Sequence, residues 1–114
     1  MHSIPYTILN GQKIVSAFVN GIKSTFIFDL NQDQTLINSV YFKDNKRISL
    51  DGKLILLDKL NLYGLKVINK NYKAQDLSLY EKNGRTIHGI FGQDIIEDYT
   101  LTIFDNRFIL KNKI

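Results

Sequence analysis

Short turn signals divide this chain at close intervals, and they constrain its fold more than any other feature. Asn10-Gly11, Asn20-Gly21 and Asp51-Gly52 each stand between apolar stretches. Such dipeptides favour the two-residue turns of β-hairpins, because both central positions of a type I′ turn need a positive φ. A longer strand pair is expected across 60–67, and a further short strand at 77–79. The pattern predicts a succession of β-hairpins.

The apolar residues favour strands over helices. Hydrophobic residues make up 44% of the 114, Ile, Val, Phe and Tyr are frequent, and Pro5 is the single proline. Residues 25–28 are apolar on both faces, as in a central buried strand, and they stop at a polar run that begins with Asp29. Thr35-Leu36-Ile37 then returns to the core. We expect one all-β domain over residues 1–114.

One short helix is expected near the end of the chain. Residues 93–99 follow a glycine-punctuated loop and begin with residues that can cap a helix, which predicts about two turns. Asp94 is interpreted as a cap. The tail is expected to form a last hairpin, 101–103 against 108–110, turned at Asp105-Asn106.

Composition argues against several classes of function. The chain has no cysteine and two histidines, which excludes thiol catalysis and Cys-ligated zinc and gives no support to a Ser-His-Asp triad. The acidic residues form no calcium or zinc spacing, so neither a metal nor a cofactor is expected. The lysines are scattered along the sequence despite a net charge of +4, and nucleic acid is not an expected partner.

No stretch approaches the roughly 20 apolar residues of a membrane span. The start, Met1-His2-Ser3-Ile4-Pro5, lacks the charged and apolar regions of a signal peptide. We therefore expect a soluble protein with no membrane span, and the compartment stays open.

Two segments together resemble the retropepsin-like aspartic peptidases, including their single-lobe bacterial forms. The first is similar to the family's strand, tight turn and apolar strand that lead into an Asp-Thr-Gly loop. The second is similar to the apolar strand, glycine and short helix that follow the flap. Order and spacing both fit, and the resemblance covers most of the chain, most weakly across 38–85. The segments read Val19-Asn20-Gly21-Ile22-Lys23-Ser24-Thr25-Phe26-Ile27-Phe28-Asp29 and His88-Gly89-Ile90-Phe91-Gly92-Gln93-Asp94-Ile95-Ile96.

The resemblance implies a closed β-barrel of hairpins with one short C-terminal helix, and it places the catalytic aspartate at Asp29. Aspartic peptidases need two carboxylates that share one proton, and one lobe supplies only one of them. The resemblance therefore implies a homodimer with Asp29 of each chain at a two-fold axis. An extended peptide or protein would be the substrate. The remaining site candidates are the active-site loop, Leu30, Asn31, Gln32 and Asp33; the flap, Asp51 and Gly52; and the loop support, Gly92, Gln93 and Asp94.

The loop departs from the family's Asp-Thr-Gly pattern. Leu30 stands where a threonine hydroxyl would bond across to the partner loop, and Asn31 replaces a glycine. Asparagine tolerates a positive φ better than other residues with a side chain, although it adds bulk beside the carboxylates. Retroviral members often pair an acidic residue in the loop with an arginine after the glycine; here these positions hold Asp33 and Gln93, and the Gln93 amide is expected to donate to the Asp33 carboxylate.

Three functions remain open from the sequence. The first is a homodimeric, degenerate retropepsin-like domain that binds peptides or acts as a scaffold with little or no proteolysis. The second is an active aspartic endopeptidase that uses Asp29 as shared general acid and base. The third is a structural β-barrel used only for assembly, in which Asp29 ends a strand and caps a turn with its own side chain.

Overall fold

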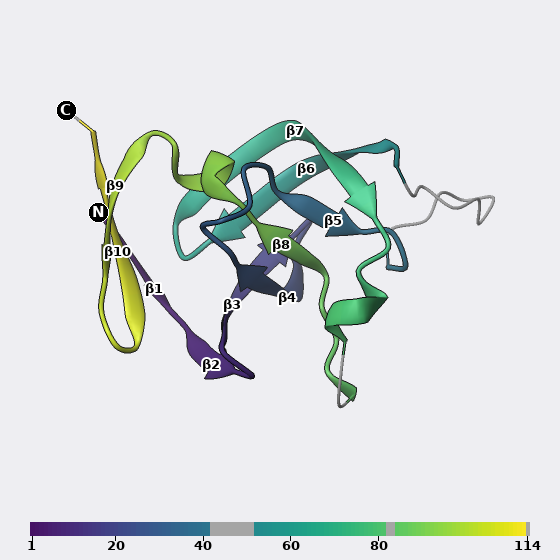
Figure 1. Cartoon of the computed structure of the whole chain (residues 1–114). Coiled ribbons are helices and arrows are strands. Elements are labelled where there is room, and N and C mark those ends of the chain that lie inside the picture. Colours follow the sequence, from purple (N-terminus) through teal and green to yellow (C-terminus); the bar gives the residue numbers. More distant parts are fainter. Residues whose placement is uncertain (42–51, 82–83, 114) are drawn as a thin grey trace.

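The computed structural model describes residues 1–41, 52–81 and 84–113. Within these residues nearly all regular structure is β, as the sequence predicts (Figure 1). The strands are β1 His2–Pro5, β2 Thr7–Leu9, β3 Gln12–Val19, β4 Ile22–Phe28, β5 Leu36–Asn38, β6 Leu54–Leu62, β7 Leu65–Gln75, β8 Gly89–Phe91, β9 Tyr99–Ile103 and β10 Arg107–Asn112. Two short 3₁₀ helices are described, η1 Ser78–Tyr80 and η3 Gln93–Ile96.

The larger sheet closes on itself to form a barrel. Its strands run in the order β2-β3-β4-β8-β5-β7-β6, and β3 also pairs with β6. The six strands from β3 to β6 therefore form a closed ring with β2 attached outside it. A closed ring removes the exposed edges that an open sheet would present to other chains. The expected closed barrel is confirmed.

The predicted turns explain how the hairpins close. Asn10, Gly11, Asn20 and Gly21 all have positive φ, as type I′ turns require. The β6–β7 hairpin turns at Tyr63-Gly64, which also have positive φ. The tail hairpin forms as expected, with Phe108 opposite Ile103.

Two local predictions need correction. Residues 77–79 do not form a strand, because the Tyr80 N–H bonds to the Leu77 carbonyl and the chain turns there as η1. The helix near the end spans only Gln93–Ile96 instead of about two turns, since β9 already begins at Tyr99.

The first and last strands form a second, smaller sheet in the order β1-β10-β9. In Figure 1 this sheet stands beside the barrel and brings the two ends of the chain together. The Tyr6 hydroxyl donates to the Phe104 carbonyl, and the Tyr6 ring lies 4.7 Å from the Phe108 ring. The chain ends are thereby joined to the barrel.

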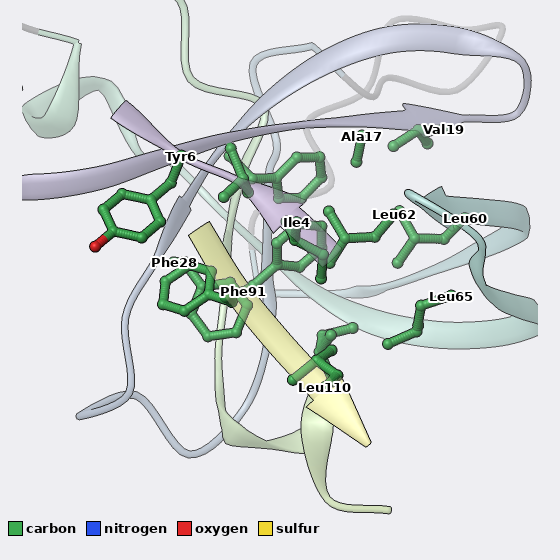
Figure 2. Close-up of a cluster of buried hydrophobic side chains, with 14 of the residues drawn as sticks. Ile4, Tyr6, Ala17, Val19, Phe28, Leu60, Leu62, Leu65, Phe91 and Leu110 are labelled. Carbon is green, nitrogen blue, oxygen red and sulfur yellow. The ribbon is translucent and has the colours of Figure 1, made fainter. Parts of the chain in front are cut away.

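The main core fills the barrel and continues under the small sheet. Figure 2 shows these side chains meeting from strands far apart in the sequence. Alternate residues of β3, namely Val15, Ala17 and Val19, point into it, as a half-buried strand requires. A second cluster lies on the other side of β4 and consists of Ile27, Leu36, Leu77, Ile87 and Ile90. The strand before Asp29 is thus buried on both faces.

Candidate active site

Asp29 directly follows β4, the strand between β3 and β8. Its N–H donates to the Phe91 carbonyl at 2.9 Å, so the parallel β4–β8 ladder continues to the aspartate itself. The Phe26 and Phe91 rings stack 4.1 Å apart beneath it. The side chain of Asp29 is half-buried at the end of a strand that is buried on both faces.

The Asp29 carboxylate caps the turn that follows it. Its Oδ1 accepts a hydrogen bond of 2.9 Å from the Asn31 N–H, and its carbonyl accepts one of 3.1 Å from the Gln32 N–H. Aspartate often bonds to the backbone two residues onward, so this bond alone fits a structural turn and a catalytic loop equally well. Asn31 is not among the residues with positive φ, which removes the expected reason for an asparagine there.

Backbone bonds fasten the Asp29 loop to the segment after β8. The Gln93 N–H donates to the Gln32 carbonyl at 2.8 Å, and the Asp94 N–H donates to the Asp33 carbonyl at 3.2 Å. The Gln93 side chain also reaches the loop, but its acceptor differs from the expected one. Its Nε2 donates to the Leu30 carbonyl at 2.6 Å and not to the Asp33 carboxylate. A neutral amide is satisfied by a backbone carbonyl, whereas an arginine would seek the carboxylate.

Gly92 is required by the close approach of the loop. A Cβ placed on it would lie 2.6 Å from the Gln32 carbonyl oxygen and 2.8 Å from the Gln34 carbonyl carbon. Both neighbours are backbone atoms, so they cannot move aside without displacing the loop. Gly92 therefore allows the loop to pack this closely because it has no side chain.

A threonine–aspartate pair completes the attachment. The Thr35 hydroxyl donates to Asp94 Oδ1 at 2.6 Å, and the Thr35 N–H donates to the same carboxylate at 2.9 Å. The hydroxyl also accepts a bond of 3.1 Å from the Gly92 N–H. Asp94 is therefore no helix cap, since its carboxylate bonds to Thr35. Thr35 was missed as a site residue; its only sequence signal is a hydroxyl just before a buried strand.

Leu30 points its apolar side chain toward the main core. It is half-buried and packs against the cluster that fills the barrel. A leucine has no hydroxyl to offer a second chain. The loop thus keeps its backbone hydrogen bonds, and the side chain at position 30 packs against the core.

The flap candidate is described only in part. Asp51 lies outside the described residues, and Gly52 precedes β6 with a φ of +79°. The Gly52 N–H donates to the Ala74 carbonyl and the Ala74 N–H donates to the Lys53 carbonyl, both at 2.7 Å. Gly52 is thereby joined to β7. The hairpin expected around Asp51-Gly52 stays a prediction.

An open depression of about 740 Å³ adjoins the loop. Its lining combines the loop, η3, the start of β9 and the tail, and it carries carboxylates of both the loop and η3. The lining residues are Leu30, Asp33, Gln34, Gln93, Asp94, Ile96, Glu97, Tyr99 and Lys113.

Tyr72, on β7, is a second residue that the sequence did not single out. Burial, together with the negative charge of Asp94, raises the pKa of its hydroxyl to about 12. The hydroxyl is buried and has no hydrogen-bond partner within the described part of the chain. It stays protonated at every physiological pH.

The comparisons with known proteins agree with this geometry at the level of the fold. No protein-family model matches the chain, and no curated protein matches it. A retropepsin-like aspartic protease from Rickettsia conorii, known from a crystal structure, is similar with a TM-score of 0.62 and 18% sequence identity. The match covers 94% of this chain and 86% of that one.

The chain therefore has the retropepsin-like fold, a closed all-β barrel with a strand leading directly into Asp29. At this level of identity the similarity establishes the fold and leaves the chemistry to the residues. Among the described residues, no helix is long and apolar enough to cross a membrane.

Proposed function

We propose that this protein is a homodimeric retropepsin-like domain that binds extended peptides and cleaves them weakly or not at all. The observation that carries the proposal is the contrast within the Asp29 loop. Its backbone is held by hydrogen bonds to Gln93 and Asp94, whereas Leu30 packs into the core and supplies no hydroxyl.

The homodimer follows from the chemistry of an aspartic dyad. Two carboxylates a few ångströms apart cannot both ionise, so they share a proton and act as base toward water and as acid toward the carbonyl. One chain brings a single Asp29 at the end of β4. The depression beside Leu30 supports an interface on this side, because it adjoins the loop and is open to a partner.

Weak catalysis follows from what the loop lacks. In the resemblance described above, a threonine hydroxyl joins the two loops and a glycine leaves room beside the carboxylates. Here a leucine and an asparagine occupy these positions. The Asp29 carboxylate keeps its bond from the Asn31 N–H, but Leu30 offers no hydroxyl to join the two loops of a dimer.

A restoration experiment separates this proposal from its rival, the active endopeptidase. Purified protein is incubated with a mixed peptide library at about pH 4 to 6.5, the range in which a shared carboxylate proton titrates. The wild-type chain should cleave little. The double variant Leu30→Thr/Asn31→Gly should cleave at least about a hundredfold faster, the typical contribution of general acid–base catalysis.

The control for this experiment is the same double variant with Asp29→Asn, which should lose all of the gained activity. Rapid cleavage by the wild-type chain that Asp29→Asn abolishes would contradict the proposal and support the endopeptidase. A monomeric mass in solution, measured by sedimentation equilibrium, would contradict both and leave the structural barrel.

A further inference from the structure

The outer face of the barrel carries a row of four residues from four neighbouring strands. Phe18 on β3 lies opposite Lys23 on β4 and opposite Asn61 on β6. Asn61 in turn lies opposite Lys66 on β7. Phe18 and Asn61 therefore lie between the two lysines, which stand three strands apart around the closed barrel.

This row faces outward because its neighbours along the strands face inward. Ala17 and Val19 flank Phe18 and are buried, and Leu60 and Leu62 flank Asn61 and are buried. Figure 2 shows these four side chains among the core residues. Phe18 itself is 50% exposed. A large aromatic side chain left open in the middle of a sheet is a feature of interaction surfaces when it lies within a larger apolar patch.

More apolar and basic side chains extend the row. Ile68 is 62% exposed and lies opposite the exposed Lys59, and Tyr63 at the β6–β7 turn is 49% exposed. We call these residues together the lysine face: Phe18, Lys23, Lys59, Asn61, Tyr63, Lys66 and Ile68. The lysines are separate in the sequence, and the sheet register brings them together.

Two hollows of side-chain size lie on this face, on either side of Asn61. One measures about 330 Å³ and is lined by Lys59, Lys66 and Ile68 among others. The second measures about 310 Å³ and includes Phe18, Lys23 and Tyr63. Each hollow thus joins apolar walls to at least one ammonium group.

The β6–β7 hairpin contributes positive charge to this face. Residues 54–75 hold four lysines and one aspartate, Asp58, which is a net charge of +3. Two of these lysines, Lys59 and Lys66, belong to the lysine face, and both are exposed. Together with Lys23 on β4 they would attract an acidic partner to this face.

We propose that the lysine face binds an extended, acidic segment of a partner protein. Its carboxylates pair with Lys23, Lys59 and Lys66, and its apolar side chains enter the two hollows. The hollows favour a peptide over a membrane, which presents no side chains to fill them. The walls of both hollows include apolar side chains, Ile68 in one and Phe18 in the other, which suit the apolar side chains of a peptide.

This face is separate from the candidate active site. Lys13 of β3 pairs with Phe28 of β4. Because the strands are antiparallel, the residue before Lys13, Gln12, lies beside Asp29. Phe18 stands six residues further along β3, about 20 Å away at the usual rise of a strand. The inference therefore does not rest on the proposed function, and Asp29→Asn should leave binding at this face unchanged.

The test measures binding of a fluorescent library of short peptides built from glutamate, phenylalanine and leucine, by anisotropy at low salt. The variant Lys23→Gln/Lys66→Gln should weaken binding about tenfold, as expected for the loss of two exposed ion pairs. Raising the ionic strength should weaken it further. Phe18→Ala should lower the affinity without changing the salt dependence.

The matched controls are Lys73→Gln, an exposed lysine on the same hairpin, and a library with glutamine in place of glutamate. The Lys73→Gln variant should bind the glutamate library as tightly as the wild-type chain does. The wild-type chain should bind the glutamine library poorly. Absence of binding, or equal binding by all variants, would overturn the proposal. Tighter, lysine-dependent binding of a single-stranded RNA or of phosphatidylserine vesicles would overturn the assignment to an acidic peptide.

Discussion

Strands β3 and β4 end in two very different ways. At one end, the two residues Asn20-Gly21 turn the chain with positive φ, and no atom lies within 4 Å of where a Cβ of Gly21 would stand. At the other end, β4 leads into the Asp29 loop, which is held by residues about 60 positions away. The first end depends on local backbone preference. The second depends on long-range packing, and this is where the candidate chemistry lies.

The largest expected difference between the two ends concerns their glycines. Gly92→Ala should destabilise the protein by about 3 kcal/mol, because the new Cβ would overlap loop backbone that cannot yield. Gly21→Ala should cost only about 1 kcal/mol, the strain of a positive φ in open space. Urea unfolding followed by circular dichroism measures both. Equal losses would show that the loop is no more tightly held than the turn.

A smaller effect is expected at the Thr35–Asp94 pair. Thr35→Val keeps the shape but removes the hydroxyl bonded to Asp94 and to the Gly92 N–H, which should cost about 2 kcal/mol. Thr100→Val is the matched control, since its exposed hydroxyl bond to the Lys111 carbonyl is 3.4 Å long. The free energy of unfolding should be clearly lower for Thr35→Val than for Thr100→Val. An unchanged free energy of unfolding in Thr35→Val would show that the Thr35–Asp94 pair does not hold the loop.

The smallest effect is a pH dependence midway along β4. Burial lowers the pKa of His88, although the negative charge of Glu81 acts in the opposite direction. The unfolded chain then binds a proton more readily than the folded one. The stability contributed by neutral His88 is fully present above the ordinary histidine pKa of about 6.5. It is lost as the pH falls toward the lower pKa of His88 in the folded chain.

Stability should therefore decrease from neutral toward acidic pH, with Tyr41 and Glu81 facing the imidazole. His88→Gln, whose side-chain oxygen still accepts a bond from the Thr25 N–H, should flatten this decrease. Thermal unfolding over a pH series checks the result. A slope that is unchanged in the variant would assign the acid sensitivity to other groups.

The sequence predicts the parts of this protein that depend on neighbours in the chain. The Asn-Gly turns, the alternation in β3 and the doubly apolar strand before Asp29 are local patterns with a direct physical cause. The Gln93 acceptor, the bonds of Asp94 and the role of Thr35 were not predicted, because each depends on how the loop docks against the end of β8. The helix at Gln93–Ile96 is shorter than its capping residues predicted because β9 already begins at Tyr99.

The lysine face is a second feature that the sequence does not predict. In the sequence its lysines are spread from position 23 to position 66 with no block of charge. Only the register of β4, β3, β6 and β7 brings Lys23 and Lys66 into one row. Charge counts along a chain therefore understate what a closed sheet can gather on one face.

The central claim is that two chains meet at their Asp29 loops. The chain has no cysteine, so a single spin label can be attached at Asn31→Cys, an exposed position two residues after Asp29, or at Lys23→Cys at the opposite end of β4. Pulsed electron spin resonance on each labelled protein then measures the distance between the two labels of a dimer. The account predicts a short, narrow distance for Asn31 and a much longer one for Lys23. No dipolar coupling at Asn31, or a shorter distance at Lys23, would contradict it.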